Sequence, residues 1–180
     1  LDPVISYAFE PGSTMKAFTY MAAMESNNYN GSDTFKSGRI AVGDDVIKDW
    51  NVKGWGTISY DSGFALSSNV GVTNLIQKYM NRSILKNYFL KLGFGSKTNI
   101  ELPNEVKGKI DFKYPIEVAT SGFGQGITTT PIQNIQALTV ISNNGIMLRP
   151  YIVDKIVDPN NGEIVYQGVK KRSSRERMRW

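Results

Sequence analysis

Residues 9–24 read FEPGSTMKAFTYMAAM, and the interpretation of the whole chain starts from this stretch. Pro11-Gly12 breaks an extended segment, and a helix is predicted from Ser13 to about Met24. Lys16 is the one charged side chain between Pro11 and Met24, and no carboxylate lies beside it. The stretch therefore predicts a buried helix with a lone lysine one turn after a serine.

Ser13 and Lys16 have the spacing of a nucleophile and its base. Side chains three residues apart share one face of a helix, so the Lys16 amine is expected to reach the Ser13 hydroxyl. A serine hydroxyl is a poor nucleophile until a base takes its proton. Burial disfavours the charged form of lysine and lowers its pKa, and the apolar residues up to Met24 supply that burial. The structural alternative is an N-capping serine and a lysine whose amine reaches solvent.

The composition narrows the chemistry, because the chain has no histidine and no cysteine. This excludes Ser-His-Asp and Cys-His catalysis, and zinc sites built from thiolates or imidazoles. A general base must therefore be Lys, Asp, Glu or Tyr. No metal ion and no organic cofactor is expected.

Ser67 and Asn69 form a second polar turn, within the apolar flanks of ALSSNV at residues 65–70. A short helix is expected to end near Leu66, and residues 70–79 are predicted to form the next helix. A serine hydroxyl can relay a proton, and an asparagine amide can both donate and accept hydrogen bonds. A plain capping turn between two helices is the alternative.

The other predicted elements surround these two turns. Residues 29–63 are expected to be a long, mostly irregular insert with short strands. A second Ser-x-x-Lys copy, Ser83 to Lys86, is interpreted as a capped surface helix. Residues 147–157 and 163–169 predict a hairpin. Thr130-Pro131 opens a helix whose apolar face is Ile132, Ile135, Leu138 and Ile141.

The positive charge of the chain is concentrated at its end. The formal net charge is +5, and residues 170–180 alone contain six Lys or Arg residues against Glu176. The remaining residues are neutral overall, so nucleic-acid binding by the folded body is not expected. Residues 168–180 are predicted to be a disordered or non-native basic tail. No apolar run approaches the ~18 residues that span a bilayer.

FEPGSTMK followed by ALSSNVG resembles the transpeptidase domain of class B penicillin-binding proteins, within the penicillin-recognising, serine β-lactamase-like superfamily. GFGSKTNIELPNEVKG at 93–108, GFGQGITTTPIQ at 122–133 and NNGIMLRPYIV at 143–153 agree with that family. The resemblance covers residues 1–167, which are assigned as a partial transpeptidase domain. It implies an α+β fold, with an antiparallel sheet flanked by helices and a helical subdomain, the sheet being incomplete in this chain.

The resemblance also implies roles for four residues. Ser13 would be the acylated nucleophile and Lys16 its base. Ser67 would pass a proton to the leaving amine, and Asn69 would orient Lys16 and the substrate amide. The implied activity is D,D-transpeptidation of peptidoglycan stem peptides, with covalent binding of β-lactam antibiotics. The implied location is the extracytoplasmic face of the bacterial membrane, with cell-division or elongation proteins as partners through the parent chain.

One departure from the family concerns its third motif, Lys-(Ser/Thr)-Gly, which should follow the second motif on a strand. The one such triplet here, Lys36-Ser37-Gly38, precedes Ser67 and is interpreted as a loop. The chain is therefore expected to be truncated before the third motif and impaired when isolated.

Two other functions stay open from the sequence. A β-lactam sensor or non-catalytic module would keep the same serine and lysine. A serine β-lactamase would need a deacylating carboxylate, for which Glu101 is the candidate. The glycines of Gly122–Gly126 are expected to form a structural loop under the active site rather than a phosphate-binding loop.

Overall fold

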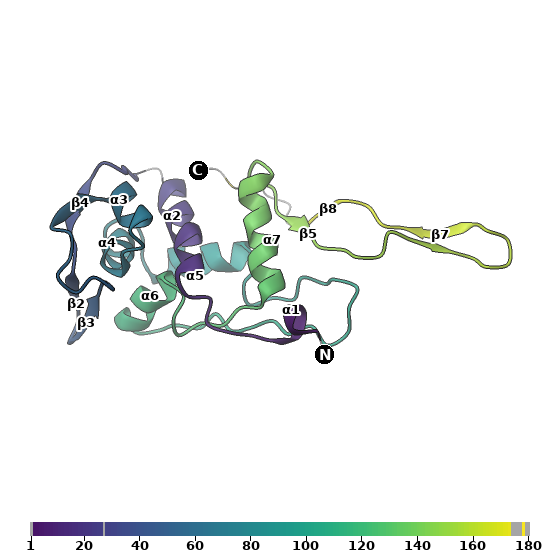
Figure 1. The fold of residues 1–180 in the computed structure, drawn as a ribbon, viewed down its shortest axis with the longest axis horizontal. Helices are drawn as coiled ribbons and strands as arrows, with labels where there is room; N and C mark the ends of the chain where they lie inside the picture. The colour runs from purple at the N-terminus through teal and green to yellow at the C-terminus, as the bar shows by residue number, and fades with distance from the viewer. Residues whose placement is uncertain (1, 27, 174–177, 179–180) are drawn as a thin grey trace. The chain divides into compact units, whose positions relative to one another are not determined.

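The computed structural model describes residues 2–26, 28–173 and 178. These residues form two compact units (Figure 1). The first unit comprises residues 2–8, 91–108 and the described part of 129–179. The second unit comprises residues 9–90 and 109–128, so all four candidate site residues belong to it.

Helices build the centre of the second unit. Three of them, α2, α4 and α6, pack against one another, and α4 also contacts α3. Phe18 and Ala22 of α2, and Val72 and Leu75 of α4, are among the buried apolar side chains that form the core. The helical elements are the 3₁₀ turn η1 (Gly12–Thr14), α2 (Met15–Glu25), α3 (Tyr60–Ala65), α4 (Asn69–Tyr79), α5 (Arg82–Lys91) and α6 (Pro115–Gly122).

Two small antiparallel sheets complete the second unit. β1 (Thr34–Lys36) pairs with β4 (Thr57–Ser59), and β2 (Arg39–Val42) pairs with β3 (Asp45–Lys48). The predicted irregular insert is therefore more ordered than expected. Both strands of the second sheet contact α4, which brings the end of β3 close to the start of that helix.

The first unit is organised around α7 (Pro131–Ser142), whose N-cap Thr130 and N3 residue Gln133 form a capping box. α1 (Pro3–Ser6) contacts α7, and β5 (Leu148–Arg149) follows it. The predicted hairpin is present as β6 (Lys155–Val157) and β7 (Ile164–Gln167), and it extends away from α7 (Figure 1).

The mixed α+β class with helices and antiparallel strands is confirmed, and the strands lie in four two-stranded sheets among the described residues. Two short helices were not predicted. α1 forms where an extended segment was expected, and α6 forms just before the glycine-rich loop, where no element was predicted. Ser13 also lies in η1 rather than in the first turn of the α-helix.

Of the four apolar residues predicted to share one face of α7, Ile132 is buried and the other three are exposed. Ile135 is 59% exposed, and Leu138 and Ile141 are also exposed. The buried residues of α7 also include Ala137 and Val140, together with Gln133 and Gln136. The Gln133 amide donates to Ser96 O and Lys107 O, and the Gln136 amide donates to Leu148 O and Ser173 Oγ.

Part of the predicted basic tail belongs to the described chain. β8 (Lys171–Arg172) pairs antiparallel with β5, and the Met178 N–H donates to Gly145 O. Residues 174–177, 179 and 180 lie outside the described residues, so the nature of the tail stays a prediction. Within the part of the chain that the structure describes, no helix has the length and apolar character to cross a membrane.

Candidate active site

Contacts between two glycine-containing segments support the backbone beside Ser13. Gly12 adopts φ +58°, and its N–H donates to Gly124 O at 3.0 Å. A Cβ added at Gly124 would lie 2.1 Å from Gly12 O, so no side chain fits there. The Gly126 N–H also donates to Glu10 Oε1 at 2.9 Å. The glycine-rich segment therefore acts as a structural support, and it leaves the Ser13 side chain exposed.

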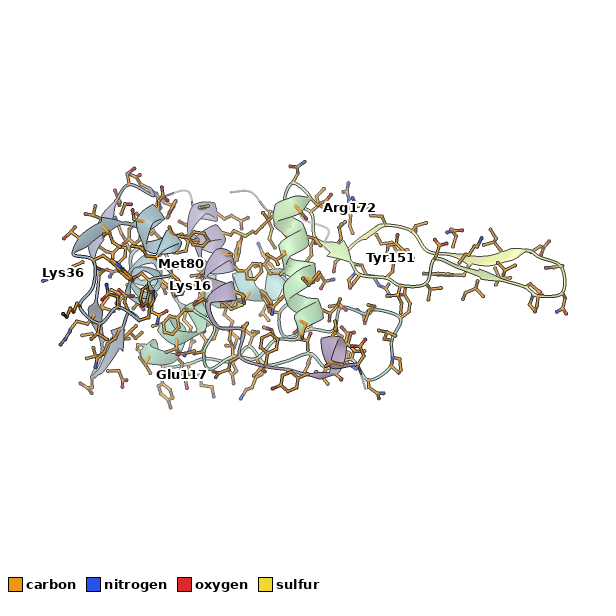
Figure 2. All side chains as sticks on the ribbon, in the orientation of Figure 1. Lys16, Lys36, Met80, Glu117, Tyr151 and Arg172 are labelled. Atoms are coloured by element: carbon orange, nitrogen blue, oxygen red, sulfur yellow. The ribbon has the colours of Figure 1, made fainter. Side chains whose placement is uncertain are left out.

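Lys16 lies in the first turn of α2 and is only 3% exposed. Its Nζ donates to Ser67 O at 2.5 Å and to Ser67 Oγ at 2.9 Å. Figure 2 shows Lys16 among the packed side chains of the second unit, whereas Lys36 projects at the edge of that unit. The predicted burial of the lone lysine is therefore present, and its amine is directed toward Ser67.

Ser67 lies in the turn between α3 and α4, and its hydroxyl connects the other two side chains. Ser67 Oγ donates to Ser13 Oγ at 3.2 Å and accepts from Lys16 Nζ. Each hydroxyl can also turn, so that Ser13 donates to Ser67 and Ser67 donates to an uncharged Lys16 amine. Ser13 and Lys16, both described by the structure, make no direct hydrogen bond to each other. The direct contact expected from their spacing is therefore replaced by a contact through Ser67.

The electrostatic setting lets the Lys16 amine lose its proton at a lower pH than an ordinary lysine. Burial lowers the pKa of Lys16 from 10.5 to about 8, and the negative charge of Asp49 opposes this effect. Near pH 8, about half of the molecules therefore carry the uncharged amine that can accept a proton. No group of three His, Cys, Asp or Glu residues able to hold a metal ion occurs among the described residues.

Known proteins are similar to this chain in sequence and in fold. A family model, the penicillin binding protein transpeptidase domain, matches residues 2–178. The chain belongs to this family. The matched region extends past Gln167, where the transpeptidase resemblance was expected to end.

Individual relatives of this transpeptidase domain are similar over most of the chain. Stage V sporulation protein D of Bacillus subtilis is 33% identical over 170 residues, which cover 92% of this chain and 26% of that protein. Peptidoglycan D,D-transpeptidase FtsI of Escherichia coli K12 is 32% identical over 165 residues, or 90% of this chain and 27% of that protein. The chain thus spans about a quarter of the length of these relatives.

A solved structure gives the same result. The crystal structure of penicillin-binding protein 2X from Streptococcus thermophilus matches with a TM-score of 0.89 and 35% identity. The match covers 96% of this chain and 25% of that chain. The fold of this transpeptidase domain is therefore that of the class B penicillin-binding proteins.

Asn69 begins α4 in the transpeptidase domain, two residues after Ser67. Its Nδ2 donates to Lys48 O at 3.2 Å, and among the described residues it makes no hydrogen bond to Lys16. Asn69 is half-buried. Its role in orienting Lys16 and a substrate stays a prediction.

Ser37 and Glu101, which belong to the alternatives considered from the sequence, both have structural partners. Ser37, from the early Lys-Ser-Gly triplet, is buried and donates to Gly56 O at 2.8 Å. Glu101, the candidate carboxylate of a hydrolase, belongs to the first unit and accepts from Ile152 N–H at 3.2 Å and Tyr166 OH at 3.4 Å. Neither contact suggests a catalytic role.

Asp49 is a residue near the site that the sequence did not assign. It is 2% exposed and is followed by Trp50, whose indole N–H donates to Leu66 O at 3.0 Å. In the sequence it appears only as one acid in an Asp-Trp pair. Its contacts come from segments far apart in the chain, and no local pattern predicts them.

Proposed function

We propose that this chain carries the acylation centre of a peptidoglycan D,D-transpeptidase, with Ser13 as the nucleophile and Lys16 as its base. The observation that supports this assignment is the position of Ser67 Oγ, 2.9 Å from Lys16 Nζ and 3.2 Å from Ser13 Oγ. A buried amine, a relay hydroxyl and an exposed serine are what serine acylation needs in a protein without histidine.

In the proposed reaction, Ser13 Oγ attacks the carbonyl carbon of the bond between the two terminal D-alanines of a stem peptide. The Ser13 proton passes through Ser67 to the uncharged Lys16 amine, and a C–O bond forms. The backbone N–H of Ser13 contributes to stabilising the negative oxygen of the intermediate. The C–N bond then breaks as Lys16 returns the proton, through Ser67, to the leaving D-alanine.

The second half of the reaction transfers the acyl group. The amine of a neighbouring stem peptide attacks the ester on Ser13, so that a peptide cross-link forms and the serine is released. A penicillin would acylate Ser13 by the same first step, with cleavage of its lactam C–N bond. The acyl group would then stay on Ser13, because the proposed centre includes no efficient deacylating base. Asn69 would hold the amide of the substrate during both steps.

The setting of the proposed activity follows from the same assignment. We place the parent protein on the extracytoplasmic face of the bacterial membrane, where stem peptides and β-lactams are its ligands and cell-division or elongation proteins its partners. The 180 residues contain no Lys-(Ser/Thr)-Gly triplet after Asn69. If that motif supplies an oxyanion donor, the isolated chain acylates slower by about 10²–10³-fold, a rate that stays measurable.

Covalent labelling tests the proposal. The 180-residue chain is incubated with benzylpenicillin, and the adduct is located by intact mass and peptide mapping. We expect one penicilloyl group on Ser13 and none in Ser13→Ala. The matched control is Ser83→Ala, from the second Ser-x-x-Lys copy, which should be labelled like the wild type.

Two outcomes would contradict the assignment. An adduct on another residue would exclude Ser13 as the nucleophile, and the absence of any adduct after prolonged incubation would exclude acylation by this chain. Rapid release of hydrolysed penicillin would instead favour a serine hydrolase. With a D-Ala-D-Ala peptide in place of penicillin, an acyl group on Ser13 that is never transferred to an acceptor amine would favour the β-lactam sensor.

A further inference from the structure

The backbone of Ser67 adopts a conformation that needs support from its surroundings. Its φ is +54°, in the left-handed region that residues other than glycine rarely occupy. Such conformations persist where neighbouring contacts impose them, and they occur often at functional sites. On one side, the end of α3 provides these contacts, because Ser67 N–H donates to Phe64 O at 3.0 Å and Ser68 N–H donates to Gly63 O at 2.8 Å.

On the other side, three consecutive residues contact the same turn. The carbonyl of Lys48 accepts from the Asn69 side chain at 3.2 Å, and the Trp50 indole donates to Leu66 O at 3.0 Å. Asp49, between them, makes the most extensive contacts. Residues 48–50 therefore lie alongside residues 66–70 and contact most of the turn that carries Ser67.

The Asp49 carboxylate joins three backbone or side-chain donors. Its Oδ1 accepts from Ser68 Oγ at 2.8 Å and from the Val70 N–H at 3.0 Å. Its Oδ2 accepts from the Gly38 N–H at 2.8 Å. Ser68 Oγ in turn accepts from the Gly71 N–H at 2.8 Å, which caps α4. The carboxylate thus ties the residues after Ser67 to the loop at Gly38.

We propose that Asp49 is a positioning residue for the acylation centre, which holds the turn so that Ser67 Oγ remains between Lys16 Nζ and Ser13 Oγ. The inference rests on the proposed function and adds a residue that does not itself touch the reacting atoms. A buried carboxylate suits this task, because hydrogen bonds to an ionised acceptor are about twice as strong as neutral ones. The three donors also satisfy a charge that is otherwise costly to bury.

Asp49 also acts on Lys16 through its charge. This electrostatic effect provides a readout that a purely structural role of Asp49 would not change. α2 packs against η1, α4 and α6. The charged residues on these elements besides Lys16 are Glu25, Lys78 and Glu117. Of the described charged groups, Asp49 is the one that raises the pKa of Lys16 against the effect of burial. Removing the Asp49 charge should therefore lower that pKa.

The test compares Asp49→Asn with a matched control in the 180-residue chain. Asparagine keeps an oxygen for Ser68 and Val70 but removes the charge and one acceptor. The control is Glu105→Gln, since Glu105 is also buried and accepts three hydrogen bonds, from the Thr98 N–H, the Thr98 hydroxyl and the Asn99 N–H. Glu105 lies in the first unit, which contains none of the proposed catalytic residues.

The readout is the rate constant for penicillin acylation as a function of pH, corrected for the folded fraction. For Asp49→Asn we expect a rate about 10–100-fold lower and a midpoint at lower pH than in the wild type. Glu105→Gln should keep both the rate and the midpoint. Equal losses in the two variants, or a wild-type rate and midpoint in Asp49→Asn, would overturn the inference.

A second measurement does not depend on acylation. Amide hydrogen exchange should be faster at Ser68, Val70 and Gly71 in Asp49→Asn than in the wild type, and unchanged there in Glu105→Gln. Ser68→Ala, which removes one Asp49 partner, should show a smaller effect of the same kind. Unchanged exchange at this turn would overturn the inference even if the wild type acylates. If the wild type is never acylated, the proposed function is wrong, whereas the exchange measurement still tests the role of Asp49.

Discussion

Lys16→Met is expected to lower the rate of Ser13 acylation by at least about 10³-fold, because the variant lacks the proposed base. Methionine has nearly the length and volume of lysine, so the packing of α2 is retained. The measurement is the rate of labelling by a fluorescent penicillin, with the same concentration of folded protein in each sample.

The stability of this variant distinguishes loss of a base from loss of the fold. Methionine removes a buried amine whose charged form is disfavoured, but it also removes two hydrogen bonds to Ser67. These effects oppose each other, and the free energy of unfolding at pH 7 should change by no more than about 1 kcal/mol. It is measured by urea denaturation.

Lys86→Met is the matched control, because Lys86 occupies the same position in the second Ser-x-x-Lys copy. Its amine forms an exposed ion pair with Asp111 at 3.4 Å, so its loss should affect neither labelling nor stability strongly. Labelling of Lys16→Met within tenfold of the wild-type rate would exclude Lys16 as the base.

Ser67→Ala should lower the acylation rate by about 10²–10³-fold, because it interrupts the connection between Ser13 and Lys16. The variant keeps the backbone carbonyl of Ser67, to which Lys16 Nζ also donates. The lysine should therefore stay in place while the relay hydroxyl is lost. The rate is measured with the same fluorescent penicillin.

Ser142→Ala is the matched control for this variant, because Ser142 begins another Ser-x-Asn copy. Its hydroxyl is exposed and donates to Thr139 O at 3.3 Å, within its own helix. We expect its labelling to match the wild type. If Ser67→Ala acylates normally while Lys16→Met does not, the proton passes directly from Ser13 to Lys16 and the relay is wrong.

Much of the site could be predicted from local sequence. Ser13 and Lys16 are one helical turn apart, and the apolar residues that follow them imply a buried amine. The contact with Ser67 joins residues 51 positions apart, and spacing within one helix cannot show it. The polar turn within apolar flanks made Ser67 a candidate relay, the family resemblance implied its role, and its place between Ser13 and Lys16 comes from the structure.

The parts that could not be predicted depend on tertiary contacts. α6 contains β-branched residues that favour strands, yet it forms because Glu117 accepts from the Tyr114 N–H and because the helix packs against α4. α7 directs Gln133 inward because loop carbonyls satisfy its amide. Asp49 likewise has partners at Gly38 and Val70, which no periodic pattern connects.

The most direct test of the account is the titration of the Lys16 amine by NMR in ¹⁵N,¹³C-labelled protein, together with the pH dependence of Ser13 acylation. Burial lowers the pKa of Lys16 to about 8, so the amine should lose its proton near that pH. The acylation rate should rise with pH through the same midpoint, because only the uncharged amine accepts the serine proton. A Lys16 pKa near the ordinary lysine value of 10.5 would contradict the account. An acylation rate that does not change with pH across the Lys16 titration would also contradict it.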